Sequence, residues 1–234
     1  MHILSFIHHS VDMSAFVAHH VDILGVAPTN LHIFVHGAKL DVPVPRVNLR
    51  YYPNITYTSD VKRDIINAHL RDLGSRHPNA LIAQVDGDER LYLPCSCTSA
   101  DECIYATMID RWNETSPLCA NVRGRLLKGG TKKNAMAPIM WNRRILKFIS
   151  SHSGYYGGTK CKVSSCKGAM EHFSLTKTQF KLAKEKLATY HNDKERGPIY
   201  ERMLAHNDSY YFDWMRKNPV MCPSLQMNRA DSGH

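Results

Sequence analysis

The chain has 234 residues, of which 43% are hydrophobic and 22% charged, a composition typical of a folded globular protein rather than a disordered one. No apolar run is long enough to cross a bilayer, and the opening segment MHILSFIHHSVDM lacks the basic leader and cleavage site of a signal peptide. We therefore expect a cytoplasmic protein without a transmembrane segment, although a chain that lacks an upstream anchor would have the same features. The net charge of +9 favours binding of polyanionic partners such as nucleotide phosphates. The alternative is that the basic residues form a solvated surface.

The chain before Pro94 alternates between strand-like and helix-like patterns. In chain order these patterns predict a strand over 2–9, a helix over 14–27, strands over 30–37 and 47–52, a helix over 59–74 and a strand over 80–86. Strands that alternate with helices indicate a mainly parallel sheet with right-handed crossovers. We expect an α/β fold, with three α/β/α layers around a central mixed, mainly parallel sheet.

Particular residues mark the ends of these elements. Gly25 lies near the end of the first helix and Gly37 stops the second strand, because glycine tolerates the left-handed backbone found at such ends. Ser59 or Asp60 is expected to cap the second helix, and Gly74 to end it.

Beyond Pro94 the pattern loosens into short strands and loops, with apolar segments over 104–112 and 141–150, before becoming helical again near the C-terminus. Nothing in it demands a second domain. We therefore expect one domain over residues 1–219 and a flexible C-terminal tail over residues 220–234.

The seven cysteines are an odd number, so a complete set of disulfides would leave one thiol over. They contain no C-x-x-C pair, the spacing typical of structural zinc sites, which argues against such a site. In an oxidising compartment we expect disulfides within residues 95–119.

Three acids, Asp86, Asp88 and Glu89, follow the buried strand in ALIAQVDGDERLYLP. Carboxylates packed so closely repel one another unless a cation or solvent compensates, and ligands bind at the carboxyl ends of strands in α/β sheets. Two aspartates separated by one residue can turn both carboxylates toward one Mg²⁺ or Mn²⁺, ions that prefer hard oxygen ligands. A solvated D-G-D turn is the alternative.

Four segments resemble, in their order and spacing, the nucleotide-sugar half of a family-2-like glycosyltransferase: MSAFVAHHVDILGV, SDVKRDIINAHL, ALIAQVDGDERLYLP and IYATMIDRWNETSPL. The third is similar to the D-x-D-E-F metal-binding strand of that family and the fourth to its M-x-D-R strand. A weaker match runs through SSHSGYYGG and GAMEHFSLTKTQFKLAKEKLATY, where the family has a histidine before an amphipathic helix. The resemblance implies the A-type (GT-A) fold of nucleotide-diphospho-sugar transferases.

The resemblance also implies roles for single residues. The metal ligands would be Asp86, Asp88 and His172, with Mn²⁺ or Mg²⁺ as the cofactor. Asp110 would be the catalytic base that deprotonates an acceptor hydroxyl. The substrate-binding residues would be Lys62, Arg63, Asp86, Arg111 and His152.

A structural alternative exists for several of these residues. Lys62 and Arg63 are also explained as surface charges of a helix, and His172 as a histidine with ordinary partners in the core. Asp110 and Arg111 are also explained as a structural arrangement in which each side chain pairs elsewhere.

One departure from the family pattern concerns the second strand, which ends FVHGAKLDV. His36 and Gly37 stand where the family has an Asp-Asn-x-Ser-x-Asp-Gly loop that helps to bind the nucleotide. A divergent or inactive member of the family therefore stays open as an alternative.

We expect a metal-dependent, inverting transfer of a sugar from a nucleotide-diphosphate donor to a hydroxyl of a glycan, lipid or protein acceptor. One alternative is a metal-dependent phosphodiesterase or nuclease that uses the same acids. Another is a polyanion binder without catalysis. The sequence shows no motif of interleaved aromatic and basic residues for specific nucleic-acid binding.

Overall fold

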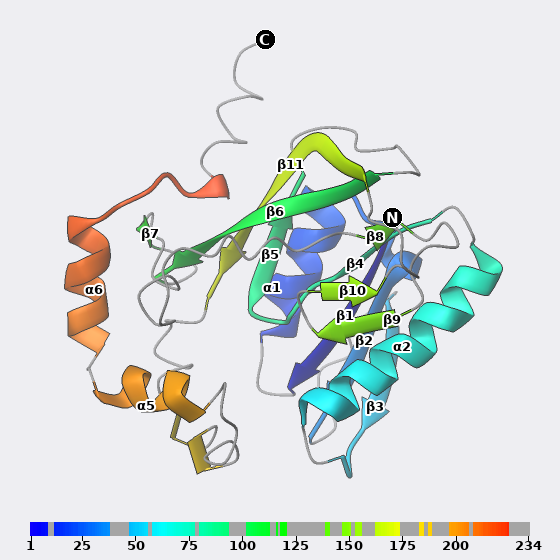
Figure 1. Ribbon diagram of the computed structural model, residues 1–234, viewed down its shortest axis with the longest axis horizontal. Helices are drawn as coiled ribbons and strands as arrows, with labels where there is room; N and C mark the ends of the chain where they lie inside the picture. Colours follow the sequence, from blue (N-terminus) through cyan, green and yellow to red (C-terminus); the bar gives the residue numbers. More distant parts are fainter. Residues whose placement is uncertain are drawn as a thin grey trace. The chain divides into compact units, whose positions relative to one another are not determined.

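The computed structural model (Figure 1) describes residues 1–8, 12–37, 47–55, 58–77, 80–93, 102–112, 116, 118–120, 139–140, 147–150, 153–155, 162–173, 183–184, 187–188, 197–205 and 208–224. The chain forms two compact units, Met1–Thr107 with Asn134–Ala169 and Met108–Lys133 with Met170–His234. Strands β6 (Glu102–Arg111) and β11 (Lys162–His172) each continue from the first unit into the second. The expectation of a single domain stays a prediction.

The first unit is built on a five-stranded sheet in the order β3-β2-β1-β4-β8. The strands are β1 (His2–His8), β2 (Leu31–His36), β3 (Asn48–Tyr52), β4 (Leu81–Gln84) and β8 (Ile139–Met140). The first four of these strands run parallel, and β8 joins β4 antiparallel. The prediction of an α/β fold with a mixed, mainly parallel sheet is confirmed at this level.

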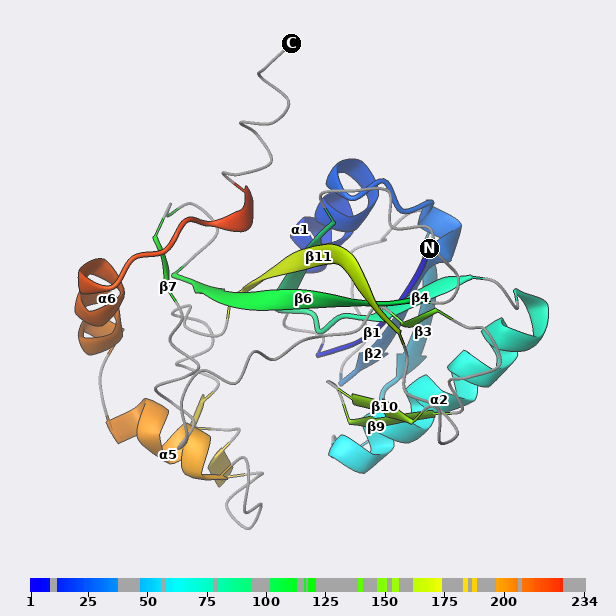
Figure 2. The same ribbon diagram turned by 45° about the horizontal axis from the view of Figure 1, so that its top comes forward.

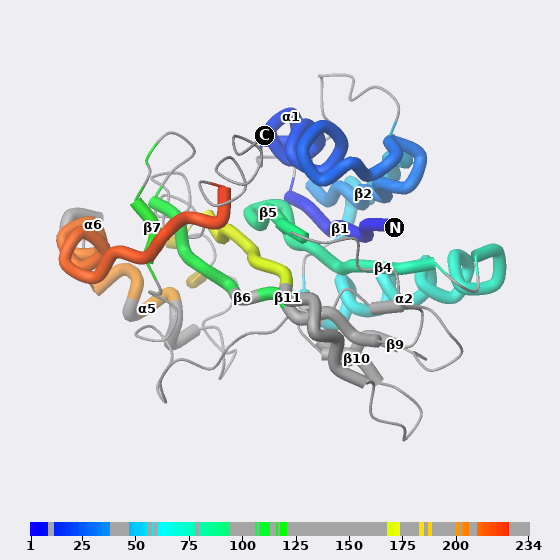
Figure 3. Tube along the Cα trace, turned by 90° about the horizontal axis from the view of Figure 1, so that it is seen from above, coloured from blue at the N-terminus to red at the C-terminus, as the bar shows by residue number. Residues whose placement is uncertain are grey.

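Two helices cover this sheet. Figure 3 shows α1 (Met13–Ala18) and α2 (Ser59–Arg76) on opposite sides of it. The core under α2 combines alternate strand residues with one helix face, namely Leu4, Phe6, Phe34 and Ile82 with Ile66, Leu70 and Leu73. Each of these buried side chains stabilises the unit by about 1.5–3 kcal/mol relative to exposure.

The first predicted helix is divided. Asp12 caps α1 by accepting a hydrogen bond from the Ala15 N–H at 3.0 Å, and α1 passes directly into a π-helix, η1 (His19–Ile23). The backbone then turns at Gly25, where φ is 72°, and Gly37 after β2 has φ 94°. Both glycine predictions are confirmed. The π-helical turn was not predicted, because its apolar positions fit an ordinary helical period equally well.

The ends of α2 differ from the prediction. The cap is Thr58 rather than Ser59 or Asp60, since the Thr58 hydroxyl accepts a hydrogen bond from the Val61 N–H at 3.1 Å. The helix also continues past Gly74 as far as Arg76. It ends there because His77 precedes Pro78, and the proline ring disfavours helical backbone in the preceding residue.

The remaining strands form two further sheets. One has the order β5-β11-β6-β7, with β5 at Glu89–Tyr92 and β7 at Cys119–Ala120. The other is a hairpin of β9 (Lys147–Ser150) and β10 (Ser153–Tyr155), which lies beside α2 (Figure 2). A short 3-10 turn, η2 (Pro28–Asn30), precedes β2.

The second unit contains α5 (Gly197–Ala205) and α6 (Asp208–Lys217). Its buried core consists of Ala120, Ala183, Met203, Tyr211 and Met215. None of the helices among the described residues is long and apolar enough to span a membrane.

Candidate functional site

The turn Asp86–Glu89 follows β4 at the carboxyl edge of the parallel sheet. In the order β3-β2-β1-β4, the chain passes from β1 to β2 and then to β3 on one side of β1. Strand β4 pairs with β1 on its other side. The Val85 N–H donates to the Leu4 carbonyl at 3.1 Å, so the chain leaves the sheet for the turn directly beside β1. Ligands of open α/β sheets bind where the strand order reverses in this way. The Asp86–Glu89 turn therefore begins at the switch point of the sheet.

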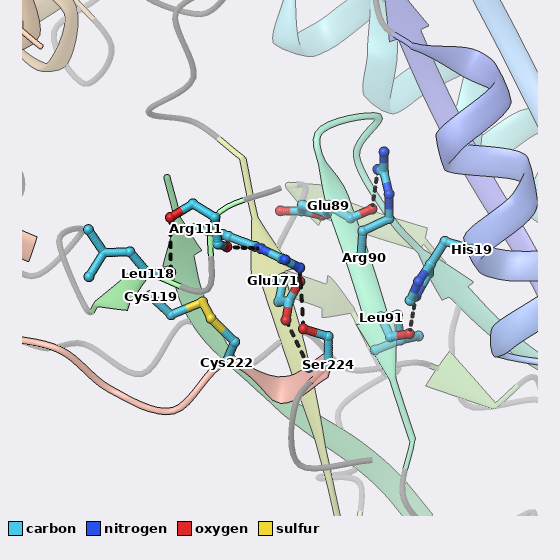
Figure 4. A network of polar contacts seen from close by, with 11 residues as sticks. His19, Glu89, Arg90, Leu91, Arg111, Leu118, Cys119, Glu171, Cys222 and Ser224 are labelled. Carbon is cyan, nitrogen blue, oxygen red and sulfur yellow. Dashed lines mark hydrogen bonds and ion pairs between the residues drawn. A yellow bond between two sulfur atoms is a disulfide. The ribbon is translucent and has the colours of Figure 1, made fainter. Parts of the chain in front are cut away.

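Glu89 holds the turn closed. Its carboxylate accepts a hydrogen bond from the Asp86 N–H at 2.8 Å, and its own N–H donates to the Asp86 carbonyl at 3.0 Å. The Arg90 guanidinium donates to the carbonyls of Gly87 and Glu89, each at 3.1 Å. Figure 4 shows the contact between Arg90 and Glu89. Glu89 thus has a structural role in the turn, which leaves Asp86 and Asp88 as its candidate ligand carboxylates.

Lys62 forms an ion pair with Asp86. The lysine side chain is 5% exposed and the aspartate side chain 28% exposed, so the ammonium group is buried beside a carboxylate that solvent reaches. Lys62 lies in the first turn of α2, where the helix dipole is positive and favours anions. The structure therefore brings together two of the predicted residues, Lys62 and Asp86, within the first unit.

Arg63 has a different environment from Lys62. Its side chain is 36% exposed, and it pairs with Asp60 at 2.7 Å and with Asp64 at 3.1 Å, both on the same helix. Hydrogen bonding to Asp64, together with the charges of Asp60 and Asp64, raises the pKa of Arg63. These contacts match the surface-charge alternative for Arg63.

Aromatic rings pack together at the end of β2, where the glycosyltransferase family has an acidic loop and this chain has His36 and Gly37. The His36 ring stacks on Phe6 at a centroid distance of 4.8 Å and meets the edge of His8 at 5.0 Å. His36 is buried, with 8% of its surface exposed. Its position is thus explained by packing, and the described ends of β1 and β2 carry stacked aromatic rings.

In the second unit, Asp110 and His172 contact each other. The Nδ1 atom of His172 lies 2.9 Å from an oxygen of Asp110, and both side chains are buried. Because a carboxylate is an acceptor, this contact places the ring proton on Nδ1. Asp110 therefore orients the histidine ring and favours one tautomer.

The neighbouring residues on the same two strands form a second pair. Arg111 donates to Glu171 at 2.7 Å, and Glu171 is fully buried. Successive side chains of a strand point to opposite faces, so adjacent residues of β6 and β11 supply two separate pairs. Asp110 and Arg111 thus each pair elsewhere, as the structural alternative described. Sequence reasoning missed Glu171, although it directly precedes the predicted His172.

His152 lies outside the described residues. Of the other predicted ligands, Asp86 and Asp88 belong to the first unit and His172 to the second. Among the residues that the structure describes, the one group of three metal-binding side chains with ligand atoms within 4.8 Å is Cys119, Glu171 and Cys222.

The Asp86–Glu89 turn has one feature that favours binding of Mg²⁺ or Mn²⁺ and one that weakens it. Two carboxylates are a typical protein share of such a site, since substrate phosphates and water complete the shell. A carboxylate also has two oxygens, so Asp86 can contact Lys62 through one and a cation through the other. However, the Lys62 ammonium reduces the negative charge that attracts the ion. A divalent ion at this turn therefore stays a prediction.

Three buried histidines, which we call the histidine row, lie at the opposite edge of the sheet: His2, His32 and His69. The ring nitrogens of His2 and His32 are 3.1 Å apart, and those of His32 and His69 are 3.3 Å apart. Burial, followed by the charge of neighbouring groups, lowers the pKa of His2 to about 4 and that of His32 to about 3. Burial also lowers the pKa of His69. The row is therefore neutral at pH 7.

Neither a known protein-family model nor a curated protein matches the chain. The resemblance to glycosyltransferases thus rests on the motifs alone and stays a prediction.

Proposed function

We propose that the protein is a metal-dependent glycosyltransferase that moves a sugar from a nucleotide-diphosphate sugar to an acceptor hydroxyl. The observation that carries the proposal is the Asp86–Glu89 turn, which begins at the switch point of the sheet. The α/β fold, with helices on both sides of the mainly parallel sheet, supports the proposal at the coarser level of fold class.

In this proposal Asp86 and Asp88 hold the diphosphate end of the donor through Mn²⁺ or Mg²⁺. The bound ion would neutralise the negative charge that develops on the departing diphosphate. Lys62 holds Asp86 in place and adds a positive charge at the same edge. The α2 amino terminus adds a further partial positive charge there.

The roles of Asp110 as base and His172 as ligand remain predictions from the resemblance. Because Asp110 is buried and contacts the Nδ1 atom of His172, we propose that the two act as a pair. In such a pair the carboxylate orients the ring, and Nε2 is the nitrogen that accepts a proton or binds a cation.

A second candidate is a nucleotide-binding protein without transferase activity. The ion pair between Lys62 and Asp86 favours it, because an ammonium group already partly neutralises the carboxylate on which the metal would depend. The His36 packing at the end of β2 favours it as well, since a stacked histidine ring stands at the position where the family has an acidic residue.

One assay separates these candidates. Purified protein is incubated with UDP-sugars and GDP-sugars, with Mn²⁺ or chelator, and the nucleotide products are separated by chromatography. A transferase releases the nucleoside diphosphate, because the bond at the anomeric carbon breaks. A phosphodiesterase releases the nucleoside monophosphate and a sugar phosphate. A protein without catalysis releases neither.

The controls are two aspartate variants. Asp88→Ala is expected to lower the rate of diphosphate release by at least about 100-fold. A loss of this size is typical when one group that stabilises the charge of a transition state is removed. Asp22→Asn, at an exposed position outside the turn, is expected to retain the diphosphate release. Equal activity of wild type and Asp88→Ala would contradict the proposal.

A further inference from the structure

A buried group in the second unit combines two cysteines and a carboxylate. Cys119 at the start of β7 forms a disulfide with Cys222, 103 residues later (Figure 4). Glu171 from β11 lies beside them, and one ligand atom from each residue is within 4.8 Å of the others. All three side chains are completely buried.

The carboxylate of this group is charged and compensated. One oxygen of Glu171 accepts a hydrogen bond from the Arg111 guanidinium at 2.7 Å, and the other accepts from the Ser224 N–H at 2.8 Å. Arg111 also donates to the Ser224 hydroxyl at 3.2 Å and to the Ser116 carbonyl at 3.0 Å. With the disulfide formed, one carboxylate faces one guanidinium, and the buried group has no net charge.

We propose that, once the disulfide is reduced, Cys119, Cys222 and Glu171 bind a zinc ion. A dithiol reductant cleaves the S–S bond, giving two thiols in the protein while its own sulfurs form a disulfide. Zn²⁺ then replaces the two thiol protons, which are released to solvent. Thiolate sulfur and carboxylate oxygen are both zinc ligands, and water would supply the fourth position of a tetrahedral site.

The charges favour this exchange of a covalent bond for a metal. Two thiolates and one carboxylate are balanced by one divalent ion and the Arg111 guanidinium, so the buried group again has no net charge. An uncompensated buried charge would be strongly unfavourable. Either form of the group therefore satisfies the same electrostatic requirement.

The geometry needs a modest change. Two sulfurs bound to one zinc ion at about 2.3 Å lie about 3.8 Å apart, which is further than in a disulfide. The two Cα atoms are 5.3 Å apart, and Cys222 belongs to a segment whose residues Val220 and Met221 are exposed. The Val220 N–H donates to the Cys119 carbonyl at 2.8 Å. A shift of the exposed segment can thus increase the distance between the two sulfur atoms. The hydrogen bond from Val220 keeps the segment next to β7 during that shift.

Residues 220–224 would thus be held to β7 in either redox state, by a disulfide or by a zinc ion. In an oxidising compartment the disulfide would hold residues 220–224 to β7, and in a reducing one the zinc ion would do so. Zinc binding here does not depend on the proposed transferase activity.

The test uses Co²⁺ as a spectroscopic substitute for zinc in the full-length protein. Protein reduced by a phosphine under anaerobic conditions is titrated with Co²⁺, and the thiolate-to-cobalt charge-transfer absorption is followed. We expect one Co²⁺ per chain in the reduced protein, displaced by Zn²⁺, and no such band in the oxidised protein. Glu171→Gln is expected to weaken binding about tenfold or more.

The other cysteines provide the control. Cys119→Ser/Cys222→Ser retains the remaining cysteines of the seven in the chain and should lose the band. Because that variant can fail to fold, wild-type protein is also alkylated with and without Zn²⁺ and analysed by mass spectrometry. Zinc should protect Cys119 and Cys222 selectively. Absence of the band in reduced wild type, or equal alkylation of these two cysteines with and without zinc, would overturn the inference.

Discussion

At the scale of single residues, Lys62 and Arg63 are consecutive basic residues with opposite environments. Lys62 is buried against Asp86, whereas Arg63 is partly exposed and pairs within its own helix. The sequence predicted both as substrate-binding residues, because two adjacent charges on a helix cannot be distinguished without the neighbouring strand. The contact of Lys62 with Asp86, in the turn after β4, comes from packing between elements that are distant in sequence.

Substitutions of Lys62 and Arg63 by the same residue test this difference in environment. Lys62→Met removes the ammonium group that contacts the Asp86 carboxylate, so we expect a loss of about 2 kcal/mol in the free energy of unfolding. That is less than the about 3–5 kcal/mol of a fully buried broken pair, because Asp86 is 28% exposed. Arg63→Met should leave the urea midpoint almost unchanged. Equal midpoints for the two variants would contradict the buried ion pair.

The histidine row predicts a stability that depends on pH. Because the folded pKa values of His2 and His32 lie near 4 and 3, the unfolded chain binds protons first as the pH falls below about 6.5. Stability is therefore complete well above pH 6.5 and decreases as the pH falls from about 6.5 to about 4 for His2 and to about 3 for His32, by several kcal/mol for the two residues together. Urea unfolding at pH 7 and pH 5 measures this change.

The central histidine provides the control for that measurement. His32→Phe keeps an aromatic ring between His2 and His69 but removes one titrating group and both ring hydrogen bonds. We expect a smaller loss of stability between pH 7 and pH 5 than in the wild type. An identical loss would show that other groups cause it.

At the scale of elements, the apolar strands and the stops at Gly25 and Gly37 could be predicted from the sequence, since they follow from burial and from backbone geometry. The contact between Asp110 and His172 could not be predicted, because local patterns contain no information about strand pairing between β6 and β11. The cap of α2 was misplaced because Thr58, Ser59 and Asp60 are all suitable capping residues.

The position of the cap is testable. Thr58→Ala should lower the free energy of unfolding by about 1 kcal/mol, because it leaves the Val61 N–H without its acceptor. Thr58→Ser keeps the hydroxyl and should cost much less. Ser59→Ala is the second control, and a larger effect there than at Thr58 would contradict the cap.

At the scale of the whole molecule, the chain consists of two compact units that each contain part of the predicted site. The candidate ligands Asp86 and Asp88 belong to the first, and the pair of Asp110 and His172 to the second. The segment 220–224, expected to belong to a loose tail, is bonded to β7 and Glu171 through Val220, Cys222 and Ser224. The sequence did not indicate this, because cysteine spacing does not determine which cysteines pair.

The central claim is that the Asp86–Glu89 turn binds a nucleotide diphosphate together with a metal ion. Calorimetric titration of UDP and GDP, each with Mn²⁺ and with chelator, into wild type and Asp88→Ala tests it most directly. We predict binding of one nucleotide that requires Mn²⁺ and is lost in the variant. Binding that is equally tight with chelator, or unchanged in Asp88→Ala, would contradict the claim.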